Sequence, residues 1–369
     1  MNRADTCEIR EKEKRIRNYL EKSGNEALVI GRQDNFAWFS CGGTNKVVIT
    51  SELGHGYMVF TKNKSYIVAQ TMDGPRVVDE ELKGINVEPV FLKWCDMGRE
   101  EKVSELVKGL KTVSDIPVEG ACFSPSEIYK LHYPLTDMEI ERCRLIGSKT
   151  EEVIRRVADE IKPGMSDYEI EAMLLYEYAR CDAIPEVILV GIDERISDYR
   201  HCIPSGKKVG KTVLIHPALR MAGLHANVAR MVHFGDDLPY EIEKRHEATS
   251  GIFAVAVAMC DPGRKFTDIH QKIGEMYKRL GYESEWFKHY IGGITGYMLF
   301  DGSVCFDPQA EVCINQTYDW FITITGAKTE ELSFNCSSGK VIASVTGRWP
   351  TKKYHADGQV FELPRILMK

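Results

Sequence analysis

The chain has 369 residues, of which 43% are hydrophobic and 28% charged, and its formal net charge at pH 7 is −6. These values are ordinary for a soluble globular protein, and the length allows two domains that each bury a core. Acidic and basic residues are interspersed, which excludes a basic stripe for nucleic acid or for an anionic membrane surface. The expected partner is therefore a small-molecule substrate.

The N-terminal sequence predicts a cytoplasmic location. Residues 1–20 are densely charged and contain no apolar core of signal-peptide length. The chain has no run of about 18 apolar residues that would span a membrane. Its eleven cysteines are scattered singly, without a CxxC pair, which favours reduced thiols over disulfides or a zinc cluster.

The first third of the chain alternates helical and extended patterns. Residues 8–23 have helical spacing that ends at Gly24, and a second helical pattern covers 99–110. Four short apolar runs predict strands at 27–31, 46–50, 56–60 and 65–69. Together these elements predict an α/β domain over residues 1–134.

A different pattern begins near Pro134. Residues 136–161 form one long amphipathic helix pattern, and Ser166 with Glu169 is a capping box that starts the next helix. Strands are predicted at 186–191, 212–218, 224–234, 312–318 and 320–325, and helices at 239–259 and 266–280. This order predicts an α+β domain with an antiparallel sheet core over residues 135–369.

Several motifs follow one another in an order that resembles the creatinase/aminopeptidase superfamily, peptidase family M24. They are IKPGMSDYEIEA, GLHANVARMVHFG, WFKHYIGGITGY and INQTYDWFITITGAKTEEL. Members include methionyl aminopeptidase, Xaa-Pro aminopeptidase, prolidase and creatinase. The first domain is similar too, with DNFAWFSCGG at 34–43. The resemblance implies an α/β creatinase-like N-terminal domain, an α+β "pita-bread" C-terminal domain and a homodimer.

In the metallopeptidases of that family, two Asp, one His and two Glu hold a pair of divalent metals that activate a water. At the matching positions of the two Asp this chain has His216 and Asn227, with the same spacing of eleven residues. The position of the His ligand matches Gly293.

The two Glu positions fall in the last motif. The first matches Phe321, within DWFI at 319–322, and the last matches Glu330, with Glu331 open by a one-residue shift. Four of the five ligand positions are thus changed. Glycine has no side chain, phenylalanine has no donor atom, and a neutral Asn supplies no charge to a hard cation. The resemblance therefore implies that the metal pair is absent and that no cofactor is required.

The residues that remain are rich in histidine. Alternate side chains of a strand share a face, so His225 is expected on the same side as Asn227. Imidazoles beside a carboxylate suit proton transfer near neutral pH, although they also suit zinc. The corresponding histidine of creatinase, a member that works without metal, is its acid and base, and this supports His201. The predicted catalytic residues are His201, His216, His289 and Glu330.

A second set is predicted to contact the substrate, namely His225, Asn227, Arg230, Tyr290, Gly293 and Phe321. Several of these have structural alternatives: His225 also suits a hydrogen-bonded side chain on a half-buried hairpin, and Tyr290 also suits the core. Arg230 is equally suited to pair with a carboxylate that fixes its strand, and the double glycine before Ile294 is typical of a tight turn as well as of an oxyanion site.

Three functions are compatible with these residues. The first is a metal-independent hydrolase of the creatinase type that cleaves a C–N bond in a small amidine, amide or dipeptide-like molecule. The second is a non-catalytic protein that binds a small molecule or peptide. The third is an Xaa-Pro-type aminopeptidase whose metals are held by the histidines in a new arrangement. Turnover separates the first from the second, and metal content separates both from the third.

Overall fold

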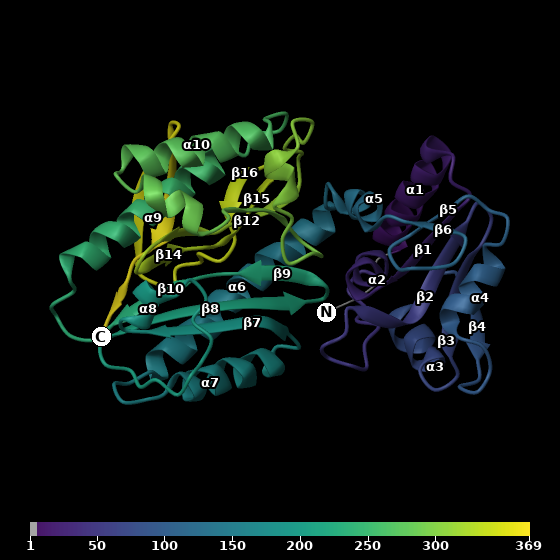
Figure 1. Cartoon of the computed structure of the whole chain (residues 1–369), viewed down its shortest axis with the longest axis horizontal. Helices are drawn as coiled ribbons and strands as arrows, with labels where there is room; N and C mark the ends of the chain where they lie inside the picture. Colours follow the sequence, from purple (N-terminus) through teal and green to yellow (C-terminus); the bar gives the residue numbers. More distant parts are fainter. Residues whose placement is uncertain (1–5) are drawn as a thin grey trace. The chain divides into compact units, whose positions relative to one another are not determined.

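The computed structural model describes residues 6–369, which fold into two compact units that meet in sequence between Tyr133 and Pro134 (Figure 1). The expected domain boundary at residue 134 lies at this junction, and residues 1–5 of the expected first domain lie outside the described residues. Among the described helices, none is long and apolar enough to cross a membrane.

The first unit is a mixed sheet with helices. Its helices are α1 (Thr6–Ser23), α2 (Gln33–Phe39), α3 (Gly74–Arg76), α4 (Arg99–Leu106) and α5 (Pro125–Tyr129). Its strands are β1 (Ala27–Arg32), β2 (Leu53–Thr61), β3 (Ser65–Gln70), β4 (Glu88–Leu92), β5 (Thr112–Ser114) and β6 (Ala121–Phe123). They lie in the order β4-β3-β2-β1-β5-β6, with both parallel and antiparallel neighbours. The predicted α/β class and three of the four predicted strands are confirmed.

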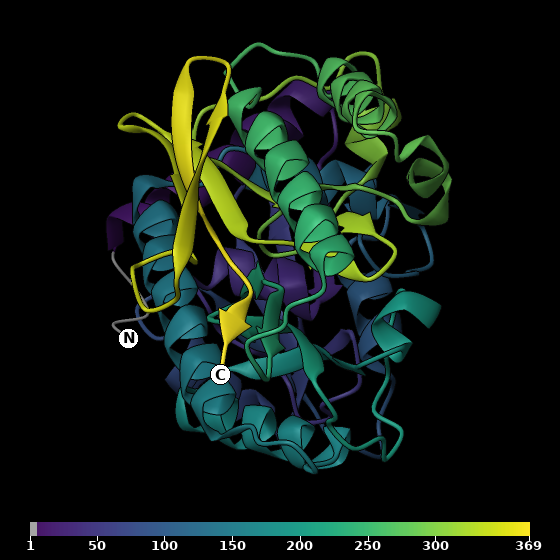
Figure 2. The ribbon, with the colours of Figure 1, turned by 90° about the vertical axis from the view of Figure 1, so that its left-hand side faces the viewer.

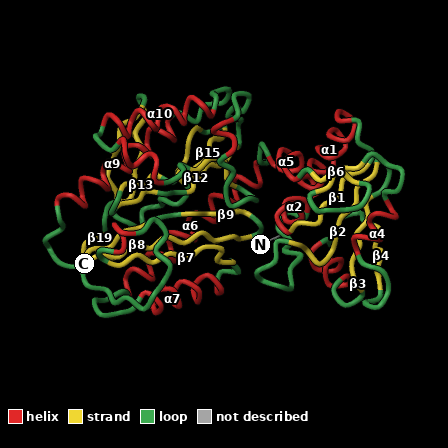
Figure 3. Tube along the Cα trace, in the orientation of Figure 1, coloured by secondary structure: helices red, strands yellow, loops and turns green. Residues whose placement is uncertain are grey.

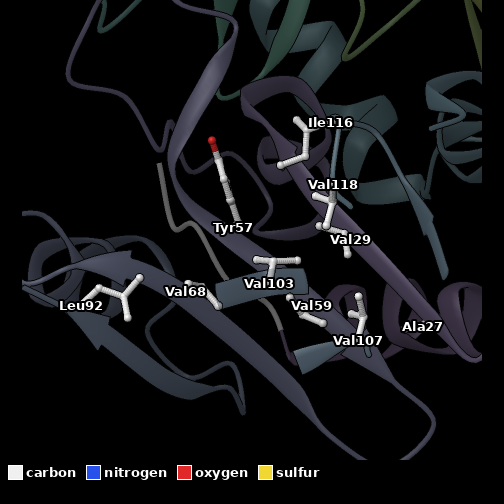
Figure 4. Packing of buried hydrophobic residues seen from close by; sticks show 10 residues of the cluster. All are labelled: Ala27, Val29, Tyr57, Val59, Val68, Leu92, Val103, Val107, Ile116 and Val118. Atoms are coloured by element: carbon white, nitrogen blue, oxygen red, sulfur yellow. The ribbon is translucent and has the colours of Figure 1, made fainter. Parts of the chain in front are cut away.

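One hydrophobic core lies against this sheet. Ala27 and Val29 occupy alternate positions of β1, and Tyr57 and Val59 do so on β2, so each pair faces the same side (Figure 4). Val103 of α4 packs against them and is fully buried. The period-two pattern of the apolar residues therefore positions the helix over this face.

The strand predicted at 46–50 is wrong. These residues form turns, and Val47, Val48 and Ile49 are 55%, 50% and 72% exposed. The preceding Asn45 has a φ of 49°. Its side-chain amide donates to the carbonyl of Gly56 at 2.7 Å, and its side-chain oxygen accepts from the N–H of Gly56 at 2.8 Å. A side chain thus takes the hydrogen bonds that a neighbouring strand would have made with the start of β2.

The second unit contains two main sheets and two hairpins. Its helices are α6 (Asp137–Glu160), α7 (Asp167–Arg180), α8 (Arg195–Asp198), α9 (Tyr240–Ala258) and α10 (Phe266–Arg279). One sheet comprises β7 (Ile184–Ile192), β8 (Thr212–Met221), β9 (Leu224–Asn227), β10 (Arg230–His233) and β19 (Leu367–Met368). The other comprises β11 (Gly292–Thr295), β12 (Gln316–Trp320), β15 (Leu332–Cys336) and β16 (Gly339–Ile342). The hairpins are β13 (Ile322–Ile324) with β14 (Ala327–Thr329) and β17 (Thr351–Ala356) with β18 (Gln359–Pro364).

Helices cover the outer faces of these sheets. Helix α7 packs along β7, and α6 packs against β8 and β9, on one side of the unit (Figure 1). Helix α9 packs against the β13–β14 hairpin and against β17, as Figure 2 shows for the green helix beside the yellow hairpin. Helices α7 and α10 mark the two outer sides of the unit in Figure 3. The strand pairings are antiparallel except for β10 with β19, as an α+β unit with an antiparallel core requires.

Local signals set the ends of several elements. The predicted capping box is present: the Ser166 hydroxyl accepts from the Glu169 N–H, and the Glu169 carboxylate accepts from the Ser166 N–H. The strand predicted at 312–318 begins only at Gln316, because Asn315 has a left-handed φ of 55°. The run 224–234 is two strands, since the N–H of Ala229 leaves the sheet ladder and donates to the carbonyl of Glu330 at 2.9 Å.

Candidate active site

A cavity of about 250 Å³ lies within the second unit. Its polar lining consists of His201, His216, Asn227, His289, Tyr290, Lys328 and Glu330. Its apolar lining consists of Val187, Leu189, Ile203, Ala218, Leu299, Phe300 and Phe321. All four residues predicted to be catalytic therefore face one cavity, together with three of the six predicted to contact substrate.

Strand pairing brings the buried polar residues of this cavity together. In the β8–β9 hairpin Ala218 lies opposite Asn227, and His216 is two residues before Ala218, so its side chain has the same direction. Glu330 directly follows β14 and is held against the link between β9 and β10 by the bond from Ala229 to its carbonyl.

An ion pair forms the centre of the cavity. The ammonium Nζ of Lys328 lies 2.6 Å from Oε2 of Glu330, and Nε2 of His216 lies 3.0 Å from the same oxygen. Lys328 Nζ is also 3.1–3.2 Å from both ring nitrogens of His216. Burial disfavours the charge of Glu330, but His216 and Lys328 outweigh it and lower its pKa to about 2. Burial lowers the pKa of His216, so this imidazole is neutral near pH 7.

A second carboxylate, Asp319, lies beside Glu330. Asp319 is on β12 opposite Gly293, and it accepts a hydrogen bond from the amide of Asn227. Burial, together with the neighbouring charge of Glu330, raises the pKa of Asp319 well above its ordinary value. Two adjacent buried carboxylates do not both ionise, so Glu330 carries the charge and Asp319 the proton. The assignment of Phe321 to this position is corrected: the residue beside Asn227 and Glu330 is Asp319, two residues earlier.

His201 and His289 form a pair at the other side of the polar lining. His201 lies in the loop after α8 and His289 just before β11, and their Nε2 atoms are 3.1 Å apart. Nδ1 of His289 is 2.5 Å from the carbonyl of Tyr290, so this nitrogen carries a hydrogen. In the neutral ring, Nε2 of His289 is then the acceptor, and Nε2–H of His201 is the donor.

This assignment leaves Nδ1 of His201 as the unprotonated nitrogen of the pair. Burial lowers the pKa of His289 to about 4, against a bond to the Tyr290 carbonyl that favours the charged form. Burial and then the charge of Lys328 lower the pKa of His201. Both imidazoles are therefore neutral near pH 7, and His201 is able to accept a proton there.

Three aromatic side chains form an apolar wall. Tyr290 stacks on Phe300 with ring centres 5.2 Å apart, and Phe321 meets both rings edge-on at 5.7 and 5.0 Å. All three line the cavity. An apolar or flat group of a ligand gains both buried area and ring contacts at such a wall.

Three residues predicted to contact substrate do not line the cavity, and the first is His225. Its Nε2 is 3.0 Å from the carboxylate of Glu186 and its Nδ1 is 2.8 Å from the carbonyl of Gly296. His225 does share a strand face with Asn227, but two residues along a strand span about 6.5 Å. That distance carries His225 away from the cavity and toward Glu186 on β7, which pairs with the other edge of β8.

The other two are Arg230 and Gly293. Arg230 is 1% exposed and donates to the carboxylate of Glu331 and to the carbonyl of Ser344, so it has the structural role considered above. At Gly293 a Cβ would lie 2.1 Å from the carbonyl oxygen of Asp301. A glycine is required there by the close approach of the backbone, and not by a ligand.

Comparison with known proteins identifies the scaffold. The model of metallopeptidase family M24 matches residues 141–319, within the second unit. A methionine aminopeptidase from Aquifex aeolicus is 28% identical over 163 residues, which are 40% of this chain and 62% of that protein. Residues 141–319 of this chain are thus similar to the metallopeptidases of family M24. The chain thus spans less than two thirds of the length of the aminopeptidase that it matches.

Solved structures share the pita-bread fold over nearly the whole chain. The Xaa-Pro dipeptidase from Bacillus anthracis has a TM-score of 0.77 at 15% identity and covers 98% of this chain and 100% of its own. The prolidase from Pyrococcus horikoshii OT3 has a TM-score of 0.74 at 17% identity, covering 92% and 99%. The N-terminal domain of the FACT complex subunit SPT16 from chickpea, Cicer arietinum, has a TM-score of 0.66 at 10% identity, covering 92% and 97%. The predicted two-domain fold is confirmed.

The metal pair of the pita-bread peptidases does not fit the residues of this chain. Of the five ligand positions, Asp319 and Glu330 keep a carboxylate, while His216, Asn227 and Gly293 do not. The Lys328 ammonium already lies at contact distance from Glu330 and His216, so a divalent cation on those atoms would meet a positive charge. Over residues 6–369 we find no group of three or more His, Cys, Asp or Glu arranged to hold a metal ion.

Two residues of this centre, Lys328 and Asp319, were not predicted from the sequence. Lys328 and Glu330 are alternate residues at the end of a short strand, and this spacing alone indicates a shared face. Asp319 is the only charged residue in β12, whose five residues are all buried. A carboxyl group inside a strand that is buried throughout indicates a buried polar site.

Proposed function

We propose that the chain is a metal-independent hydrolase that cleaves an amide-type C–N bond in a small molecule. The observation that carries this proposal is the neutral His201–His289 pair on the same cavity as the Lys328 ammonium. It combines a proton acceptor with a fixed positive charge, and these are the two functions that a metal-bound water and its metal supply in the peptidases.

The reaction follows from the protonation states. Nδ1 of His201 takes a proton from a water while the water oxygen bonds to the substrate carbonyl carbon. The carbonyl oxygen becomes an oxyanion, and the Lys328 ammonium stabilises this charge. His201 then donates its proton to the leaving nitrogen as the C–N bond breaks, so an acid and an amine are released. His289 accepts the Nε2–H of His201 throughout and stabilises the transient imidazolium.

The charge of the cavity favours a neutral substrate with an apolar group. Lys328 and Glu330 cancel, Asp319 is protonated, and the three lining histidines are neutral near pH 7. An ionic ligand would therefore carry an uncompensated charge into a partly desolvated site. The aromatic wall of Tyr290, Phe300 and Phe321 suits an apolar side group, which favours N-acyl amides over free amino acids.

The test is a turnover assay on protein stripped with a chelator. The panel contains N-acyl amino-acid amides, their charged counterparts, guanidino compounds and cyclic amidines. We expect hydrolysis of a neutral member without added metal, and a loss of at least ~100-fold in kcat for His201→Ala. His270→Ala is the control, because His270 packs on Trp286 and Phe306 outside the cavity lining. Activity that survives His201→Ala, or that requires added metal, would end the proposal.

A second candidate is a protein that binds a small molecule or peptide without turnover. One observation favours it: in the described part of the chain, no carboxylate hydrogen-bonds to either ring of the His201–His289 pair, so no charged group orients the base. A thermal-shift screen with the same panel separates the two functions, because a pure binding protein is stabilised by a compound that it does not consume.

We infer three further properties, the first from the resemblance and the other two from the composition and charge of the chain. They are a homodimer, a cytoplasmic location and no binding of nucleic acid. Light scattering on the eluting protein measures the first, and titration with labelled duplex and single-stranded oligonucleotides measures the last. A monomeric mass at micromolar concentration would contradict the homodimer.

A further inference from the structure

A buried carboxylate outside the cavity lining connects the segments that carry the histidine pair. Glu285 lies in the short helical turn Glu283–Lys288 and is 8% exposed. Its Oε2 accepts a hydrogen bond from Nη2 of Arg200, and its Oε1 accepts one from Nζ of Lys288 at 2.7 Å. Both oxygens of Glu285 are thus engaged by cations from two different segments.

The same carboxylate holds a third segment. Thr325 lies in the turn between β13 and β14, and its N–H donates to Oε2 of Glu285 at 2.9 Å. Its hydroxyl is 3.0 and 2.9 Å from the two carboxylate oxygens and accepts from Arg200 at 3.1 Å. Lys328 is three residues further along this hairpin, so Glu285 is bonded to the segments that carry His201, His289 and Lys328. We call Glu285 and its three partners the clamp.

Each cation of the clamp directly precedes a histidine of the pair. Arg200 is followed by His201, and Lys288 is followed by His289. The loop with His201 has no regular secondary structure, and His289 lies between a short helical turn and β11. The backbone hydrogen bonds of a helix or strand therefore do not fix the distance between the two rings.

We propose that Glu285 is a positioning residue that holds His201 and His289 in contact. Its negative charge matches two cations, and a carboxylate accepts the four or more hydrogen bonds that join the three segments. Removing this charge frees Arg200 and Lys288, so the two rings separate and His289 gains water. The effect on hydrolysis rests on the proposed function, whereas the effect on the rings does not.

The test is nuclear magnetic resonance of protein labelled with 15N-histidine, with the two rings assigned from His201→Gln and His289→Gln. Long-range 1H–15N spectra report which ring nitrogen is protonated and at which pH each ring titrates. In the wild type we expect His289 as the Nδ1–H tautomer with a pKa of about 4. In Glu285→Gln we expect the pKa of His289 to move toward its ordinary value of about 6.5 and the tautomer preference to be lost.

A matched control separates positioning from stability. Glu151 is also fully buried in the second unit and accepts the N–H of Thr346 at 2.7 Å, but it does not line the cavity or contact the clamp. Glu151→Gln is expected to lower the melting temperature without moving the titration of His289. His289 also faces Lys328 and Glu330, and both are unchanged in these variants.

The outcomes are distinct. If Glu285→Gln lowers the melting temperature as Glu151→Gln does and leaves the tautomer and titration of His289 unchanged, the positioning role is wrong. If Glu285→Gln does not fold, Thr325→Val is the second variant, because it removes the hydroxyl contacts alone. We then expect a smaller shift of the His289 pKa in the same direction. An unchanged pKa of His289 would overturn the proposal. Loss of turnover is a separate readout, so a protein without hydrolase activity still tests the clamp.

Discussion

Replacing Arg230 by methionine tests a fully buried ion pair of the second unit. Arg230 and Glu331 are 1% and 0% exposed, and the guanidinium donates to the carboxylate and to the carbonyls of Ala229 and Ser344. The hydroxyl of Ser344 also donates to Glu331. In Arg230→Met the buried carboxylate of Glu331 therefore keeps only one neutral donor, the Ser344 hydroxyl. The carbonyls of Ala229 and Ser344 lose the guanidinium that donated to them.

The size of the effect depends on pH. Burial raises the pKa of Glu331 to about 7 even beside Arg230. An acid whose folded pKa exceeds its unfolded value of about 4.3 binds more protons in the folded state, so it loses stability as pH rises between those values. The difference corresponds to roughly 4 kcal/mol in the wild type, and it grows when the guanidinium is removed. We expect Arg230→Met to cost about 3–5 kcal/mol at about pH 8, and less at about pH 5, where Glu331 is neutral.

Urea unfolding at the two pH values measures this loss. In a thermal melt at about pH 8, the same loss corresponds to a fall in melting temperature of roughly 6–20 °C, since each kcal/mol corresponds to about 2–4 °C for a unit of this size. The double variant Arg230→Met with Glu331→Gln should regain most of the loss, because no buried charge remains. A loss below about 1 kcal/mol at both pH values, or a loss equal at both, would refute the reasoning. Reduced ligand binding at unchanged stability would instead place Arg230 with the substrate-contacting residues.

Three further predictions concern the cavity. Lys328→Met should abolish turnover and lower the melting temperature more than Lys340→Met does. Loss of Lys328 leaves the buried charge of Glu330 without its ammonium partner, whereas Lys340 pairs with the partly exposed Asp261 outside the cavity. Equal effects of the two variants would contradict this prediction. Dialysis against a chelator should leave both turnover and melting temperature unchanged, with metal content measured by mass spectrometry, and a drop restored by one divalent metal would contradict it. The lowered pKa of His289, about 4 when folded, means that its contribution to stability is present above about pH 6.5 and is lost as pH falls toward 4. His289→Gln should flatten that part of the stability–pH curve in urea unfolding, and an unchanged curve would exclude His289 as its source.

Much of the fold was predictable because local patterns determine it. The helix of residues 137–160 and the capping box at Ser166 follow from apolar spacing and from side chains that satisfy free N–H groups. The strand predicted at 46–50 failed because apolar composition does not specify a pairing partner. There, Asn45 takes the backbone groups of Gly56 instead.

The site was predictable in part, because only some of its residues are specified by local sequence patterns. Motif order and spacing brought His201, His216, His289 and Glu330 into one hypothesis, and these residues do line one cavity. Strand alternation gave His225 the correct face, but it carried no information on its distance from the cavity.

The sequence by itself determined the scaffold and the loss of the usual ligands, since both depend on residue identity and spacing along the chain. Only the tertiary structure decided what replaced them. Lys328 and Glu330 are neighbours of His216 because strands more than one hundred residues apart in sequence meet at the cavity. The protonation states of His216, Asp319 and Glu330 follow from burial and from such contacts, and neither quantity is encoded in any local pattern.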